Sequence, residues 1–494
     1  MGFQGVFMSK KEGSTYPEGQ DPTRWRALFV IAISQLMVVL DASIVNIAIP
    51  KAMHDLHMSR ANSQWVVTAY TLAFGSLLLL GGRVADFVGR KRVFIIGLIG
   101  FAGASALGGF AVNQGMLFGS RALQGVFGAL LAPAALSIIN VTFTVPKERA
   151  KAFGVYGAIA GGGAAIGLIL GGFLTQYFSW RWCLGVNVPI ALIAVLLAIP
   201  FVHESKAKGD HSYDIPGAIT VFIGLFSLVF GFSRVATYGW GSVKTYEFFI
   251  AAFVFIAAFF YIEAKAKGPI LPIRVLTERN RAGSYTATLL VGSGLFAMFF
   301  LLSFYFQNIL GYSPLKSGFA FLPFSLGVIT FAGVASNLLP KLGARPLMLT
   351  GLLMASTGLL LLSRITPTSS YATHVLPSII VMSTGLALVF IPSATAGLHG
   401  IEQRDSGVAS ALINTSQQIG GSLGAALLNT IAVTAATTFG RAHASLPPTY
   451  GLVHGYSVAF KFGTVFLLTA AVVVFFTINA GKDIVVEHEG VVMH

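Results

Sequence analysis

The amino-acid sequence predicts an all-α polytopic membrane protein with about fourteen transmembrane helices. The chain of 494 residues is 55% hydrophobic and 10% charged, and its mean hydropathy is +0.77, which excludes an ordinary soluble globular protein. Apolar windows of spanning length recur between turns rich in Gly, Pro, Lys and Arg. They lie near residues 27–49, 62–81, 93–112, 116–141, 153–177, 183–202, 215–235, 246–263, 283–307, 317–339, 346–363, 374–398, 407–438 and 456–479.

The basic residues of the connections predict the orientation of the chain. Lys and Arg concentrate in the alternate connections that share a side with the N-terminus, as in Arg90-Lys91-Arg92, and the other connections hold far fewer. This asymmetry places both termini in the cytoplasm of a plasma or inner membrane protein. The net charge of +14 therefore sets topology and does not form a nucleic-acid patch. We expect polar tails over residues 1–26 and 481–494, with an uncleaved first span.

Several chemical functions are excluded by what the sequence lacks. Cys183 is the only cysteine, and the histidines show no metal-ligand spacing. No glycine-rich loop is followed by Lys and Ser or Thr, so we predict no nucleotide, no metal and no other cofactor. Paired carboxylates and nucleophile–base sets are missing from the predicted spans, which argues against an embedded enzyme.

Asp41 is the only acidic residue that we place deep in a predicted span. A carboxylate there is costly to desolvate and is normally paired, buried in protein or at a water-filled cavity. The functional interpretation is that Asp41 exchanges a proton or meets a cationic ligand. The alternative is a carboxylate that only braces a neighbouring helix.

The connection between the second and third spans has the most specific pattern. It contains Gly82, Asp86, Gly89 and Arg90, and the basic run continues to residue 92. The glycines permit a tight turn. We expect Asp86 to accept from helix N-terminal amides, and the basic run to meet helix C-terminal carbonyls or lipid phosphates.

This connection resembles the loop signature of the major facilitator superfamily, and further motifs resemble its fourteen-span drug/proton antiporter branch (the EmrB/QacA type). The resemblance runs from about residue 27 to 480. Its other motifs are 40–50 in the first span, 121–125 in the fourth, Trp180-Arg181-Trp182 with Asn187-Val188-Pro189 at the sixth, Gln307 with 311–314, and 407–424.

The resemblance implies a role in proton coupling for Arg121. This arginine lies near the outer end of span 4, at a depth comparable to that of Asp41, which permits an ion pair or a shared water-filled cavity. Gln124 follows one turn later as a candidate lining residue. The alternative is a purely structural pair that makes two buried charges tolerable.

Glycines on spans 5 and 13 predict close helix packing and conformational gating. Gly163, Gly167 and Gly171 share one helix face and Gly172 follows, while span 13 repeats the spacing at residues 420 and 424. The family's antiporter signature has a proline where this chain has Leu168, so the proline kink is missing.

An internal duplication predicts the domain organisation. Gly343 in the second half corresponds to Gly89, and Pro340 replaces Asp86. The family fold then implies pseudo-symmetric six-helix bundles at 27–203 and 283–480 around a central cavity. A linker at 204–282 carries two extra helices outside the bundles.

The predicted function is proton-coupled export of lipophilic, cationic drugs or toxic metabolites by alternating access, by a monomer that draws on the proton gradient. The alternatives are proton-coupled uptake of a nutrient and a membrane sensor or assembly protein without transport. The candidate substrate-cavity residues are Asp41, Asn46, Gln124, Tyr305, Gln307, Asn414, Gln417 and Gln418.

Overall fold

The computed structural model describes residues 23–206, 214–266, 268–401 and 405–479, and the predicted tails lie almost wholly outside this range. The described residues form 14 helical spans long and apolar enough to cross a membrane, which confirms the predicted fold class. The first half contains α1 (Arg24–Asp55), α2 and α3 (Arg60–Ser63, Trp65–Val88), α4 (Arg90–Gly109), α5 (Gln114–Thr142), α6 (Pro146–Tyr177), and α7 and α8 (Trp182–Gly185, Asn187–Phe201).

The rest of the chain adds an inserted helix pair and a second half. The inserted pair is α9 (Ile215–Tyr238) and α10 (Val243–Lys265), followed by the short α11 (Ile273–Thr277). The second half contains α12 (Arg279–Phe304) with the π-helical turn η1 (Tyr305–Ile309), α13 and α14 (Pro314–Ala320, Leu322–Leu342), α15 (Ala344–Leu362), the π-helical turn η2 (Tyr371–Val375) with α16 (Leu376–Gly397), α17 (Ser406–Ala442) and α18 (Pro448–Thr477).

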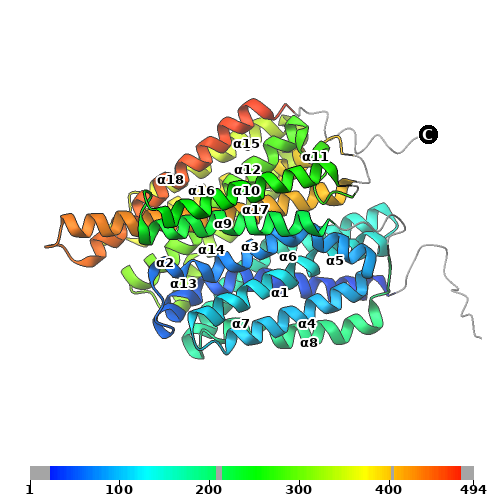
Figure 1. Cartoon of the computed structure of the whole chain (residues 1–494), viewed down its shortest axis with the longest axis horizontal. Helices are drawn as coiled ribbons and strands as arrows, with labels where there is room; N and C mark the ends of the chain where they lie inside the picture. Colours follow the sequence, from blue (N-terminus) through cyan, green and yellow to red (C-terminus); the bar gives the residue numbers. More distant parts are fainter. Residues whose placement is uncertain (1–22, 207–213, 267, 402–404, 480–494) are drawn as a thin grey trace, which may run out of the picture.

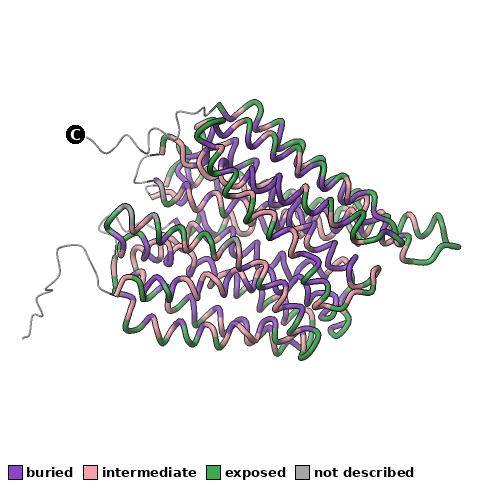
Figure 2. The backbone as a smooth tube through the Cα atoms, turned by 180° about the vertical axis from the view of Figure 1, so that it is seen from behind, coloured by how far each residue is buried: buried purple, intermediate pink, exposed green. Residues whose placement is uncertain are grey.

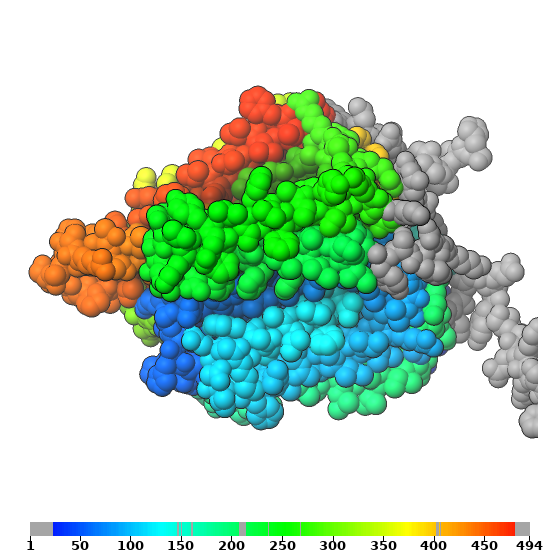
Figure 3. Space-filling view, in the orientation of Figure 1, coloured from blue at the N-terminus to red at the C-terminus, as the bar shows by residue number. Residues whose placement is uncertain are grey.

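The two halves lie side by side, with the inserted pair across their junction. Figure 1 shows most of the first half, in blue to teal, below most of the second half, whose colours run from green to red. The green surface of α9 and α10 covers the front between them (Figure 3). α9 contacts both α3 and α17, whereas α10 packs mainly on α9. Buried residues gather where the helices face one another, and the projecting α17–α18 hairpin is exposed (Figure 2).

The glycine faces of α6 and α17 pack in equivalent ways. On α6, Gly163 lies against Val39 of α1, and a Cβ on Gly171 would come within 2.7 Å of the Ile44 carbonyl oxygen, also in α1. The glycines at 420 and 424 of α17 lie in the same manner against the backbone of α12, the first helix of the second half. Each half therefore contains the same close pairing of two helices.

Gly172, by contrast, lies between the halves. A Cβ on this residue would come within 2.6 Å of the Leu315 Cα and of the Pro314 carbonyl oxygen in α13. Leu168, at the position of the expected proline, is buried within an unbroken α6. The contact between α6 and α13 consequently brings backbone against backbone.

We call the side on which α1 begins and α18 ends the termini side. On the opposite side, polar contacts join the two halves. Gln307 Nε2 donates to the Ile47 carbonyl oxygen at 3.1 Å, and Arg60 Nη1 donates to the Tyr456 hydroxyl at 2.8 Å. The halves are thus closed against each other on that side.

The turn between α3 and α4 requires glycine. Gly89 has a φ of 125°, and Gly343 has a φ of 82° at the corresponding turn between α14 and α15. A Cβ on Gly89 would also lie 2.7 Å from the Glu204 carboxylate. Both the backbone conformation and the available space therefore disfavour a side chain here.

We expect Gly89→Ala to destabilise the protein by roughly 1–3 kcal/mol, because alanine would adopt a left-handed conformation and displace Glu204. Thermal unfolding of the purified protein in detergent measures this as a lower midpoint. Gly119→Ala is the matched control, because nothing lies within 4 Å of a Cβ at that position in α5. Equal midpoints for the two variants would contradict the assignment.

Candidate functional site

A buried ion pair joins α1 to α5. Arg121 Nη1 lies 2.6 Å from Asp41 Oδ2, and both side chains are 0% exposed. Arg121 Nε donates to the Val66 carbonyl oxygen of α3 at 2.8 Å. Removing either charge would leave the other buried and uncompensated, so each depends on its partner.

Two amide side chains complete the bonding of Asp41. Gln124 Nε2 and Asn187 Nδ2 donate to Asp41 Oδ1 at 2.9 and 2.8 Å. Both nitrogens also donate to the Ser105 hydroxyl, at 2.9 and 2.8 Å, and that hydroxyl donates to the Leu184 carbonyl oxygen. The carboxylate thus ties α1 to α5 and α8, and Ser105 brings in α4.

The polar cluster around Asp41 retains spare bonding capacity. Arg121 Nη2 and Asn187 Oδ1 are buried without a hydrogen-bond partner among the described residues. The arginine Cζ lies 4.5 Å from the ring centroid of Tyr70, in a cation–π contact. Arg121 Nη2 can donate to a water molecule beside the carboxylate, and Asn187 Oδ1 can accept from one.

A cavity of about 660 Å³ lies between the two halves. Its described lining comes from α1, α3, α5, α6, α12 and α17, and on the termini side it extends to Arg83, Asp86, Asn140 and Asp405. Together with the contacts on the opposite side, this lining defines a cavity that opens toward the termini side. Its volume falls within the range of small-molecule sites.

Six of the sequence-predicted site residues line this cavity. Two of them, Gly82 and Asp86, come from the α3 end of the signature connection. The other four are polar side chains of α1 and α17, namely Asn46, Asn414, Gln417 and Gln418.

Four predicted cavity residues lie elsewhere. Asp41 and Gln124 are buried inside the first half. Since successive residues of a helix are about 100° apart, Asp41 points away from the cavity while other residues of α1 line it. Tyr305 is buried and donates to the Thr366 carbonyl oxygen within the second half. Gln307 belongs to the closed contact between the halves on the opposite side.

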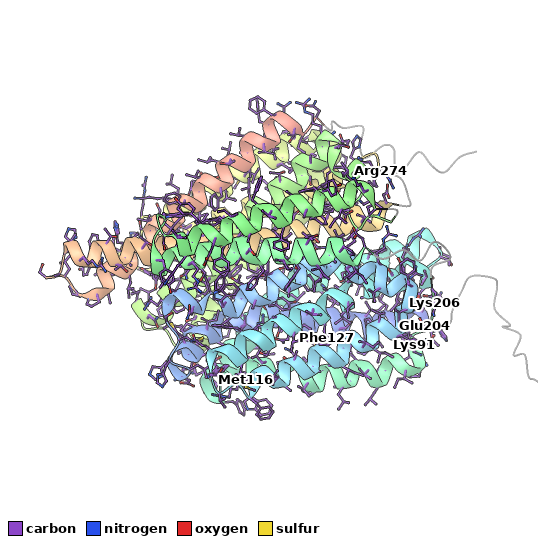
Figure 4. The ribbon with its side chains drawn as sticks, in the orientation of Figure 1. Lys91, Met116, Phe127, Glu204, Lys206 and Arg274 are labelled. Atoms are coloured by element: carbon purple, nitrogen blue, oxygen red, sulfur yellow. The ribbon has the colours of Figure 1, made fainter. Side chains whose placement is uncertain are left out.

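The hydrogen bonds of the signature connection differ from those that the sequence predicted. Asp86 accepts from its own neighbour Arg90, at 2.8 and 3.0 Å, and not from helix N-terminal amides. Glu204 takes that role, because its carboxylate accepts from the backbone amides of Lys91 and Arg92. Figure 4 shows Lys91 and Glu204 together at one end of the first half.

The basic run meets one of its two expected partners. Lys91 Nζ donates to the Ile199 carbonyl oxygen near the end of α8 at 2.7 Å. The reason for the exchanged roles is the turn itself, since the open left-handed conformation of Gly89 leaves room for the carboxylate of Glu204 beside the first amides of α4. A partner so distant in sequence leaves no local pattern.

Sequence reasoning missed Tyr70, Ser105 and Asn187 as site residues. Tyr70 both lines the cavity and contacts Arg121, so its ring separates the cavity from the ion pair. For Asn187 a signal existed, because an amide in an otherwise apolar span needs a polar partner. Ser105 and Tyr70 carry no such signal, since serine and tyrosine also occur in membrane helices without a functional partner.

Buried carboxylates also occur at the base of the inserted pair. Glu263, near the termini-side end of α10, accepts from the backbone amides of Ile270 and Leu271. Asp214 accepts from the Gly217 amide and caps α9. Among the described residues, no group of three potential ligands that could hold a metal ion is found.

A cavity between two helical halves that opens on one side only is the arrangement of a transporter that alternates access. The chain belongs to the Major Facilitator Superfamily, whose family model matches residues 31–425. This membership confirms the sequence-based resemblance and places the chain among transporters, not enzymes.

The chain is similar to several proteins named for drug resistance or export. It is 44% identical to the puromycin resistance protein pur8 of Streptomyces alboniger over 471 residues, which is 94% of this chain and 93% of the relative. It is 31% identical to the multidrug transporter protein MdtP of Bacillus subtilis, over 84% of this chain and 76% of the relative.

Solved structures support the fold. A bacterial homologue of the human lysosomal transporter Spinster superimposes with a TM-score of 0.65, at 15% identity, over 95% of this chain and 99% of that chain. At this identity the similarity concerns the fold alone.

We expect Arg121→Gln to destabilise the protein by about 3–5 kcal/mol, because it leaves the Asp41 carboxylate buried without its cation. The double variant Asp41→Asn with Arg121→Gln should lose less than the two single variants added together. Thermal unfolding of all three proteins measures this coupling. Strictly additive losses would show that the two side chains do not stabilise each other.

Proposed function

We propose that this chain exports lipophilic, drug-like compounds in exchange for protons. The observation that supports this best is the position of Asp41 and Arg121, fully buried and separated from the cavity by Tyr70. A proton on Asp41 would remove its charge and weaken the pair with Arg121. The packing of Tyr70 on the cavity side would then change with the protonation state.

The direction of transport is proposed from the relatives, whose names concern resistance to and export of antibiotics. Energy would come from the proton gradient, in which one charge moved across ~100 mV is worth about 2.3 kcal/mol. The gating elements would be the signature connection with Gly82, Asp86, Gly89 and Arg90 and the glycine contacts of α6. We further propose that a monomer suffices, because the cavity is lined by both halves of one chain.

The proposed substrate class does not include a preference for cations. That preference assumed that Asp41 faces the substrate, but Asp41 is 0% exposed and does not line the cavity. The described carboxylates of the lining are Asp86 and Asp405, and each already pairs with an arginine. Lipophilicity, and not positive charge, is therefore the property that we propose for the substrate.

The coupling proposal is tested in inside-out vesicles with an acidic interior, by adding puromycin to the wild type and to Asp41→Asn. We expect puromycin-induced proton efflux in the wild type and its loss in Asp41→Asn. Asp55→Asn in the same helix is the matched control, because Asp55 lies outside the buried ion pair and contacts Trp180. Equal efflux in all three proteins would remove Asp41 from the mechanism.

We also propose that the termini side faces the cytoplasm, on the basis of the Lys and Arg asymmetry. In a Cys183→Ala background, a membrane-impermeant maleimide added to intact cells should label Arg441→Cys and spare Lys206→Cys. Both positions are exposed, on opposite sides of the bundle, and Cys183 is buried. The reverse labelling pattern would invert the orientation.

A further inference from the structure

The deep wall of the cavity carries no charged side chain among the described residues. The charged residues of the cavity lining are Arg83, Asp86 and Asp405, and all three lie at the termini-side mouth. Asp86 pairs with Arg90, and Arg83 donates to the carbonyl oxygen of Pro269. A ligand that reaches the deep wall therefore meets apolar side chains, hydroxyls and amides.

Two amide oxygens of this lining are buried and have no donor among the described residues. They are Asn46 Oδ1 on α1 and Gln418 Oε1 on α17. An acceptor in this condition has lost its water without gaining a partner, which is unfavourable until a donor arrives. A ligand with N–H or O–H groups supplies the missing interaction.

The orientation of the Asn46 amide is fixed by its own helix. Its Nδ2 donates to the carbonyl oxygens of Ala42 and Ser43, at 3.1 and 3.4 Å. Since carbonyls accept only from the amide nitrogen, the oxygen is the atom left without a partner. Asn46 is 5% exposed and lines the cavity, so its unpartnered oxygen is buried within the cavity wall.

The second acceptor belongs to the other half of the chain. Gln418 lies on α17 where this helix packs against α3, and a Cβ on Gly75 of α3 would come within 3.0 Å of the Gln418 Cβ. One turn further along, the hydroxyls of Thr71 and Ser422 lie 2.7 Å apart. Gln418 therefore lies near the contact between the halves.

We propose that Asn46 and Gln418 form a donor-recognition subsite, one acceptor in each half. It selects lipophilic molecules that carry at least two N–H or O–H groups, and it requires no positive charge on the ligand. A ligand bonded to both oxygens links α1 to α17. Substrate binding is thereby coupled to the relative position of the two halves. This inference rests on the proposed drug-export function and specifies its substrate class.

The test compares two ligands in binding to the purified protein in lipid nanodiscs. Puromycin carries hydroxyl, amine and amide donors, and tetraphenylphosphonium is a lipophilic cation without any. We expect the wild type to bind puromycin at least roughly tenfold more tightly. Asn46→Leu and Gln418→Leu should each weaken puromycin binding by roughly 5- to 10-fold, the loss of about one hydrogen bond, and leave tetraphenylphosphonium binding unchanged.

Two controls accompany the leucine variants. Gln114→Leu removes an amide outside the cavity, where Gln114 bonds Asn62 on the opposite side, and should leave both affinities unchanged. Gln418→Glu keeps an acceptor oxygen and should retain puromycin binding. If a leucine variant does not fold, the alanine variant at the same position removes the same acceptor and is measured in its place.

The outcomes separate this inference from the function on which it rests. Puromycin binding that is unaffected at both positions overturns the subsite and leaves drug export standing. Tetraphenylphosphonium binding as tight as that of puromycin also overturns it, because charge would then suffice. If the wild type neither binds nor transports puromycin, the proposed function fails and the subsite fails with it.

Discussion

The burial of one carboxylate inside a membrane helix is the constraint on which the first half depends. Asp41 cannot remain charged there unless donors surround it, because an isolated charge is expensive in an apolar medium. The structure meets this requirement with side chains from two other helices, Arg121 and Gln124 on α5 and Asn187 on α8. A change in the charge of Asp41 therefore acts on several helix contacts at once.

The sequence predicted two roles for Asp41, proton exchange and contact with the substrate, but Asp41 does not line the cavity. The deep wall of the cavity carries neutral amides, whereas the Asp41–Arg121 ion pair lies behind it in the first half. Tyr70 touches both, since it lines the cavity and packs on Arg121. The amides of the cavity wall and the buried ion pair are consequently neighbouring but distinct, and one aromatic ring is in contact with both.

Much of the fold follows from the sequence because the bilayer imposes simple rules. Apolar length predicted about fourteen spans, and the described residues form 14. Glycine spacing predicted that spans 5 and 13 are approached closely by another helix, as Gly171 is by α1, but not which helix that would be. The sequence could not predict in which direction each side chain of a span points. Asp41 and Asn46 both lie on α1, yet only Asn46 lines the cavity, and an apolar span with little amphipathic contrast does not reveal which face meets protein and which meets a cavity.

The exchange of roles between Asp86 and Glu204 shows the second limit of sequence reasoning. A carboxylate was expected at the amides of α4, and one is present, but it comes from a residue more than a hundred positions later. The local requirement was predictable from helix chemistry, whereas its partner depends on how α8 returns to α4. Because Glu204 follows α8 closely, the same contact connects the signature turn to the end of that helix. Arg83 of the signature connection also donates to the carbonyl oxygen of Pro269, which follows α10, so this connection contacts the end of the inserted pair as well.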